Sequence, residues 1–281
     1  MRSMEDLYSL TALKCSRLIT EHYSTSFTLG IKTLHKKFHL PIYAIYGFVR
    51  YADEIVDTFH EHDKETLLAK FKADTFEAIE QGISLNPVLQ AFQLIVNKYH
   101  IDHELIHAFL YSMEMDLDHK TYNADTLDTY IYGSAEVVGL MCLRVFCEGD
   151  KEEYERLKEP ARSLGAAFQK VNFLRDIQAD FDDRGRVYFP GVDFHNFSES
   201  DKQKIEEDIQ KDFDHAFTGI KQLPDGARLG VYLAYIYYLR LFDKIKNLPP
   251  TRILSERVRI PDSIKMLLLT KTYLRHRINA I

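Results

Sequence analysis

The chain has 281 residues, of which 46% are hydrophobic, so it can form a sizeable buried core and is not a disordered chain. Its net charge of −6 excludes a general nucleic-acid binder, because such affinity rests on neutralising phosphates. The 3 cysteines are odd in number and lack metal-ligand spacing. This argues against a disulfide framework or a zinc ribbon and favours a reducing cytoplasm.

Apolar residues recur at three- and four-residue spacing along almost the whole chain, which predicts helices. We find no strand pattern and no composition break, so we predict one all-α domain over residues 1–281. The stretch 182–200 lacks the helical period and is expected to be an ordered, functional loop. The helices are expected at approximately 4–22, 41–59, 64–81, 85–99, 102–118, 125–147, 151–181, 200–221, 228–246 and 261–279.

The predicted helix 41–59 carries a polar stripe on an otherwise apolar surface. Its members are Tyr46, Arg50, Asp53 and Asp57. The two carboxylates lie one turn apart, where like charges repel. A solvated face is the ordinary explanation for such a pair, but the apolar context favours a buried stripe that needs a partner. Paired carboxylates suit Mg²⁺, a hard cation that binds oxygen ligands and substrate phosphates.

The predicted helix 151–181 carries a second polar stripe among apolar neighbours. Its members are Gln169, Asn172, Asp176 and Asp180. Unpaired buried carboxylates are costly, so they must be neutralised by other groups. Either Arg50 and Arg175 form a structural network with them, or the two aspartate-bearing helices face each other across a cavity and share metal ions. We favour the second arrangement.

A control for these stripes is a third aspartate pair, Asp208 and Asp212, which has the same spacing but is surrounded by charged residues. Charge runs of both signs are typical of solvated helix faces. We therefore predict an exposed helix without a functional role at this position.

A zinc-protease spacing, HExxH, occurs at His103, Glu104 and His107. An acidic residue near a helix start is explained by the helix dipole, and no downstream segment offers a clear third ligand. We therefore do not expect zinc hydrolase activity.

Two aspartate motifs, DEIVD at 53–57 and NFLRDIQAD at 172–180, precede RGRVYFP at 184–190. Together with YSTSF at 23–27, YIYGSAEVVG at 130–139 and ERVRIP at 256–261, they resemble the head-to-head prenyl synthases, which are the squalene, dehydrosqualene and phytoene synthases. The chain looks most like a bacterial phytoene synthase. The resemblance implies an all-helical isoprenoid-synthase fold around a central apolar cavity, closed at its mouth by the two aspartate-bearing helices.

The resemblance also implies roles for individual residues. The catalytic aspartates would be Asp53, Asp57, Asp176 and Asp180, and these four together with Asn172 would hold two or three Mg²⁺ ions. The substrate-binding residues would be Tyr23, Ser24, Thr25, Ser26, Tyr46, Arg50, Tyr130, Gln169, Asn172, Arg175, Arg184 and Tyr188.

The sequence departs from the family pattern at three places. Thr25 stands where the family often has Lys, Glu136 replaces a glycine of the small-residue run, and Thr251 or Arg252 replaces a common tyrosine. These departures bear on how the second substrate binds.

The activity implied by the resemblance is Mg²⁺-dependent condensation of two geranylgeranyl diphosphates to 15-cis-phytoene through a cyclopropyl diphosphate intermediate. The alternative is a dehydrosqualene or squalene synthase acting on two farnesyl diphosphates, with NADPH needed only for squalene. A non-catalytic helical scaffold is the alternative from another class. Prenyl diphosphates are the expected partners, and the sequence indicates no particular protein partner.

Long prenyl chains dissolve poorly in water, so we expect a cytoplasmic protein that contacts the membrane surface. The N-terminus carries acidic residues and no signal-peptide pattern, and no uncharged apolar run reaches the roughly 20 residues that span a bilayer. Residues 252–281 contain seven Lys or Arg against two acidic residues, and Met266–Leu269 is apolar. We predict that this tail binds anionic lipid. Alternatively its apolar face belongs to the core, and Arg257 and Arg259 serve the active-site mouth.

Overall fold

The computed structural model describes residues 4–118, 122–182, 188–192, 197–255 and 257–261, and within these ranges it contains helices and no strand. This confirms the predicted all-α class. The helices are, in chain order, α1 (Met4–Tyr23), α2 (Thr25–Thr33), α3 (Lys36–Asp57), α4 (Lys64–Gln81), α5 (Pro87–Tyr99), α6 (His103–Asp118), α7 (Ala124–Ile131), the π-helix η1 (Tyr132–Glu136), α8 (Val137–Cys147), α9 (Lys151–Asp182), α10 (Glu199–Ile220), α11 (Asp225–Lys246) and α12 (Pro250–Ile253).

Two predicted helix positions differ at the N-terminal end of the chain. The pattern missed α2, whose nine residues begin after Ser24, and the Ser24 side chain caps it by accepting a hydrogen bond from the backbone N–H of Phe27. Helix α3 begins at Lys36 instead of Pro41, because the His35 side chain caps it and Pro41 is accommodated within the helix. The predicted helix 261–279 lies outside the described residues.

The predicted helix 125–147 is divided by the π-turn η1. Gly133 in this turn lies so close to α6 that a Cβ atom there would come 2.4 Å from the carbonyl oxygen of Ala108. Gly165 of α9 approaches η1 from the other side, where a Cβ would lie 2.8 Å from the Cα of Glu136. The small residues of this region therefore allow close packing of α6, η1 and α9.

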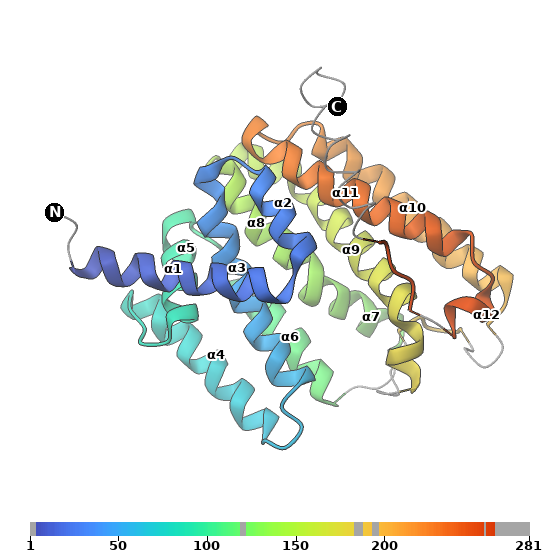
Figure 1. The fold of residues 1–281 in the computed structure, drawn as a ribbon, viewed down its shortest axis with the longest axis horizontal. Helices are drawn as coiled ribbons and strands as arrows, with labels where there is room; N and C mark the ends of the chain where they lie inside the picture. Colours follow the sequence, from blue (N-terminus) through green and yellow to red (C-terminus); the bar gives the residue numbers. More distant parts are fainter. Residues whose placement is uncertain (1–3, 119–121, 183–187, 193–196, 256, 262–281) are drawn as a thin grey trace.

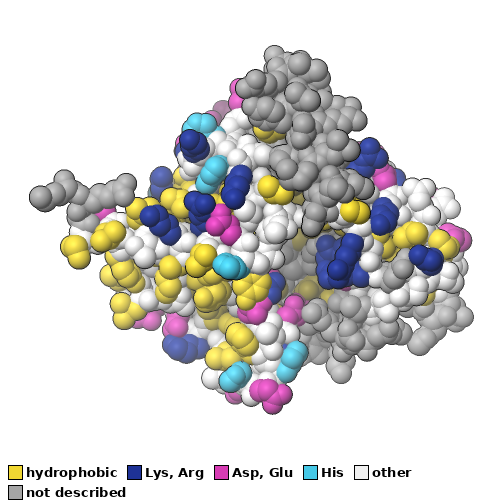
Figure 2. Space-filling view, in the orientation of Figure 1, with side chains coloured by type: hydrophobic (Ala, Val, Ile, Leu, Met, Phe, Trp, Pro, Cys, Tyr) yellow, Lys and Arg dark blue, Asp and Glu magenta, His cyan; other side chains and the backbone are white. Residues whose placement is uncertain are grey.

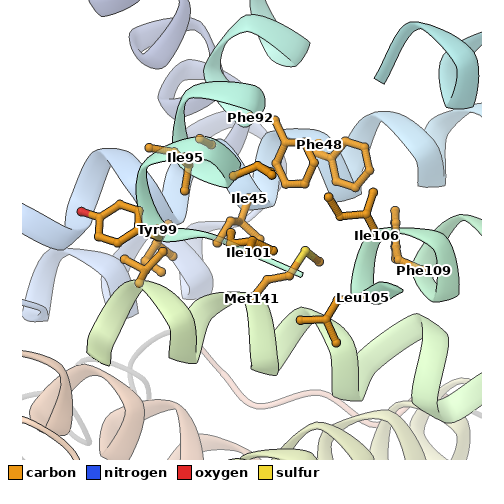
Figure 3. Close-up of a cluster of buried hydrophobic side chains, with 14 of the residues drawn as sticks. Ile45, Phe48, Phe92, Ile95, Tyr99, Ile101, Leu105, Ile106, Phe109 and Met141 are labelled. Atoms are coloured by element: carbon orange, nitrogen blue, oxygen red, sulfur yellow. The ribbon is translucent and has the colours of Figure 1, made fainter. Parts of the chain in front are cut away.

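Two clusters of buried side chains form the core. The first involves α1, α3, α4, α5, α6 and α8, and its centre is Phe48, which stacks on Phe92 with 3.8 Å between ring centroids (Figure 3). The second gathers around Phe213 and Phe242, between α9, α10 and α11. Figure 1 shows α1, α4 and α5 on the opposite side of the molecule from α10 and α11, with α8 of the first cluster between these two groups.

One stretch of the described chain, Ala124–Cys147, is long and apolar enough to cross a membrane by length and composition. Its most apolar window is 56% buried inside the fold, and it packs between α6 and α9. Such burial is typical of an inner helix of a helical domain.

Exposed apolar side chains gather over α1 in Figure 2. Met4, Leu7 and Leu18 are among them, with exposed fractions of 82%, 52% and 57%. The predicted lipid-binding tail spans residues 252–281, of which residues 256 and 262–281 lie outside the described residues.

Candidate active site

A cavity of about 490 Å³ lies between the two core clusters, lined by residues of α2, α3, η1, α8, α9, α10 and α11. Along α9 its lining changes from apolar to polar. The residues of α9 that line the cavity between Leu157 and Phe168 are apolar or glycine, whereas Gln169, Asn172 and Arg175 are polar. Leu157 and Arg175 are 18 residues apart, which is about 27 Å along a helix. The cavity therefore offers a long apolar surface that ends in a polar region.

In the acidic stripe of α3, the pKa of Asp53 is strongly raised. Burial raises the pKa of Asp53 to about 7, the positive charge of Arg50 opposes this rise, and the negative charges of Asp57 and Asp116 add to it. A buried carboxyl group that neighbouring carboxylates repel favours binding of a cation, which would relieve the repulsion.

Arg50, one turn before Asp53, is only partly satisfied by its neighbours. Its guanidinium pairs with Glu54 and lies 4.4 Å from the centroid of the Tyr23 ring. Its Nε atom is buried and has no hydrogen-bond partner in the described part of the chain. A buried N–H without an acceptor is costly, so this group suits an anionic ligand such as a diphosphate.

Asp116 of α6 is a site residue that our reading of the sequence missed. The hydroxyl of Tyr130 donates a hydrogen bond to its Oδ2 atom at 2.9 Å, and its charge raises the pKa of Asp53. Its proximity to α3 depends on helix packing, which the local sequence does not encode.

The polar residues of α9 that line the cavity are held by neighbouring helices. Gln169 donates from Nε2 to the hydroxyl of Ser134 at 3.2 Å, and Tyr238 donates its hydroxyl to Oδ1 of Asn172 at 3.2 Å. Ser134 and Tyr238 also line the cavity and were not predicted as site residues. The polar end of the cavity is therefore an ordered hydrogen-bond network from three helices.

The second aspartate motif is neutralised by arginines. Arg175 donates from Nε to Oδ1 of Asp176 at 3.1 Å, and the Nε of Arg257 lies 2.7 Å from the same oxygen. Asp180 is on the last turn of α9, but its side chain lies outside the described part, as does Arg184.

In the described chain no three His, Cys, Asp or Glu side chains form a ready metal cage. Mg²⁺ does not require one, because it is usually held by one or two carboxylates together with waters and substrate phosphates. The carboxylates of Asp53 and Asp57 and the carboxamide oxygen of Asn172 are oxygen donors of the kind it binds. These donors therefore fit a magnesium ion that binds together with its phosphate ligand.

The predicted N-terminal segment reaches the cavity in part. Ser24 and Ser26 line it, whereas Tyr23 and Thr25 are exposed to solvent. The ring of Tyr46 packs on Phe27 with 4.8 Å between centroids, and burial raises the pKa of its hydroxyl.

Tyr130 and Tyr188 belong to an aromatic cluster rather than to the cavity lining. Tyr188 stacks on Phe173 with 3.9 Å between centroids, and Tyr130 stacks on Tyr188 at 5.8 Å. Tyr188 is 6% exposed, so the part of the predicted loop that carries it is packed against the second core cluster.

The residues at which the sequence departs from the family pattern do not line the cavity. Glu136 accepts a hydrogen bond from Nε of Arg162 at 2.7 Å, and burial raises its pKa although Arg162 opposes the rise. Thr251 and Arg252 are exposed on α12.

The HExxH motif is found on the protein surface. His103, Glu104 and His107 are exposed, and the ring of His107 stacks on Phe76 at 4.2 Å. This packing gives the histidines a structural role.

The prediction that the Asp208 and Asp212 pair is fully solvated was wrong for Asp212. Its side chain is only 20% exposed and, like that of Asp208, pairs with Lys170. The pair anchors α10 to α9, because Lys170 reaches across the contact between these helices.

Comparison with known proteins was made on the sequence and on the fold. Residues 20–263 match the family model for squalene/phytoene synthase. A phytoene synthase of Arthrospira platensis is 29% identical, with 93% of this chain and 92% of that protein aligned. A 15-cis-phytoene synthase of Synechocystis is 26% identical over 98% of this chain and 87% of its own length. A dehydrosqualene synthase structure superposes with a TM-score of 0.82 at 20% identity, covering 96% of this chain and 98% of that one.

Proposed function

Because this chain belongs to the squalene/phytoene synthase family, a family of prenyltransferases, we propose that it condenses two geranylgeranyl diphosphates head to head to 15-cis-phytoene. The observation that carries the proposal is the cavity whose lining along α9 changes from apolar to polar. Its apolar length suits prenyl chains, and its polar end suits their diphosphates. We propose phytoene as the product because the bacterial relatives are phytoene synthases.

We propose Mg²⁺ as the cofactor, with Asp53, Asp57, Asn172, Asp176 and Asp180 as its protein ligands. When bound, it supplies positive charge that stabilises a departing diphosphate. The raised pKa of Asp53 supports this assignment, because a cation bound beside this carboxylate would favour its ionised form.

The protein groups have three tasks in this reaction. Arg50 and Arg175 bind the diphosphates by charge-assisted hydrogen bonds, and Gln169 helps to orient them. The apolar walls exclude water, which would otherwise capture a carbocation. The ring faces of Phe168, Tyr237 and Tyr238, which line the cavity, stabilise positive charge on the substrate, whereas Tyr130 supports the wall from outside the lining.

The second candidate is a dehydrosqualene synthase acting on two farnesyl diphosphates, favoured by the superposition with a dehydrosqualene synthase. The test is incubation of purified protein and Mg²⁺ with each prenyl diphosphate, with and without NADPH, followed by identification of the hydrocarbon. We expect phytoene from the geranylgeranyl substrate without NADPH. A 30-carbon product formed in preference would establish the second candidate, with squalene only if NADPH is consumed. A protein that releases no diphosphate from either substrate would be a helical scaffold.

We also propose that the enzyme is cytoplasmic and contacts the membrane surface peripherally. The reason is chemical, because a 40-carbon hydrocarbon must leave the cavity for an apolar environment.

A further inference from the structure

Several glycines line the cavity, and they differ in what surrounds them. For most of them, a Cβ atom would lie close to another helix: 2.8 Å from Glu136 at Gly165, 2.4 Å from Pro160 at Gly219, 2.4 Å from Leu34 at Gly230 and 3.3 Å from Ala161 at Gly139. These glycines are explained by close helix packing. Gly30 of α2 is different, because a Cβ atom there would have nothing within 4 Å.

The open space at Gly30 is on the cavity side of α2. Ser26, Phe27, Gly30 and Leu34 fall on one face of the helix, and all of them line the cavity. Other faces of the helix have other partners. The hydroxyl of Thr28 donates to the carbonyl oxygen of Thr20 at 3.3 Å, and Lys32 pairs with Glu21 at the surface. A side chain at position 30 would therefore extend into the cavity.

Backbone conformation does not explain this glycine. The positive-φ glycines of the described chain are Gly82, Gly149 and Gly191, so Gly30 has a φ that any residue adopts. Glycine inside a helix lowers its stability relative to alanine, because the unfolded chain gains more conformational entropy. Gly30 therefore makes α2 less stable and leaves space inside the cavity.

We propose that Gly30 is a substrate-contacting position whose missing side chain reserves space for a prenyl chain. The inference rests on the proposed function, because it requires that prenyl chains occupy the cavity. Gly30 is one helical turn from Ser26, a polar residue of the same cavity lining. A prenyl chain whose diphosphate binds at Ser26 would pass Gly30.

The experiment compares Gly30→Ala and Gly30→Leu with the parent protein in the presence of Mg²⁺. Two probes are titrated by calorimetry: inorganic diphosphate, and a non-ionising geranylgeranyl thiolodiphosphate. We expect Gly30→Ala to melt about 2 to 4 °C higher than the parent, from helix propensity alone. We expect Gly30→Leu to bind the prenyl probe at least about tenfold more weakly, with diphosphate binding unchanged. Gly30→Ala should show a smaller loss in the same direction, which keeps the test valid if Gly30→Leu does not fold.

Lys32→Leu is the matched control, because it adds the same side chain to the solvent face of the same helix and should leave both affinities unchanged. Unaltered binding of the prenyl probe by folded Gly30→Leu would overturn the proposal. Parallel loss of both probes would overturn it as well, because it would indicate a disturbed site. A parent protein that binds neither probe would contradict the proposed function itself.

Discussion

The Nε atom of Arg257 lies 2.7 Å from Oδ1 of Asp176, so the segment that follows α12 is joined to the second aspartate motif. Val258 and Ile260, on either side of Arg259, are buried, which fixes this segment against the second core cluster. The arginine is half exposed and its carboxylate partner is also held by Arg175. The contact therefore neutralises Asp176 beside Arg175, which lines the cavity.

Replacing Arg257 with alanine should lower activity with little effect on stability. A half-exposed ion pair contributes at most about 1 kcal/mol to the free energy of unfolding, whereas loss of a cation beside the diphosphate region should reduce kcat/KM by about tenfold or more. Steady-state kinetics and thermal melting measure the two effects. Arg259→Ala is the control, since Arg259 is exposed and should keep parental kinetics. Equal losses in the two variants would show that Arg257 has no special role.

Asp53→Asn and Asp176→Asn should each abolish product formation, with at least about a thousandfold loss of kcat, because charge stabilisation of the leaving group is the main catalytic contribution expected here. Product analysis by chromatography measures the loss. Asp208→Asn and His103→Ala should retain activity, since both residues lie at the surface. Wild-type turnover in Asp53→Asn, or zinc bound by His103 and His107, would contradict the assigned roles.

The pKa of Asp53 also predicts a dependence of stability on pH. Its pKa in the folded protein is about 7 against an ordinary 3.8, so folding favours the protonated form. As pH rises from about 4 to about 7, the unfolded chain loses this proton before the folded protein does, and stability falls. Asp53→Asn removes the loss of stability that ionisation of Asp53 causes. In metal-free buffer its melting temperature should exceed that of the parent most at pH 8, and the difference should shrink toward pH 4. A pH-independent difference would show that the raised pKa is wrong.

The sequence predicted most helices because their apolar spacing is local information. It also placed Asp53 and Asp57 on one buried face and Gln169 and Asn172 on another. The features that the sequence did not predict depend on contacts between segments that are distant along the chain. Asp116 joins the α3 carboxylates only because α6 packs on α3, and Arg257 reaches Asp176 only because the chain returns after α12. Helix α2 was missed because its nine residues are too few for a clear period.

Gly133→Ala should destabilise the protein, because the new Cβ would lie 2.4 Å from the carbonyl oxygen of Ala108 and 2.7 Å from the Cβ of Ser112. Overpacking of this kind costs about 1 to 3 kcal/mol, which corresponds to a melting temperature lower by several degrees. Gly30→Ala is the informative contrast, since the same change at an open position should raise the melting temperature. A parental melting temperature for Gly133→Ala would mean that η1 can move away from α6.

The basic tail, residues 252–281, is expected from its sequence to bind anionic lipid. Each basic residue near an anionic leaflet contributes on the order of 1 kcal/mol to binding, so neutralising Lys265, Lys271, Arg275 and Arg277 together should weaken binding strongly. Co-sedimentation with vesicles containing anionic lipid measures this, and binding of the parent protein should weaken as salt rises. Vesicles without anionic lipid are the control for the electrostatic contribution to binding. If the fourfold variant binds anionic vesicles as well as the parent at low salt, the membrane contact lies elsewhere. The exposed apolar side chains of Met4, Leu7 and Leu18 on α1 would then be the next surface to mutate.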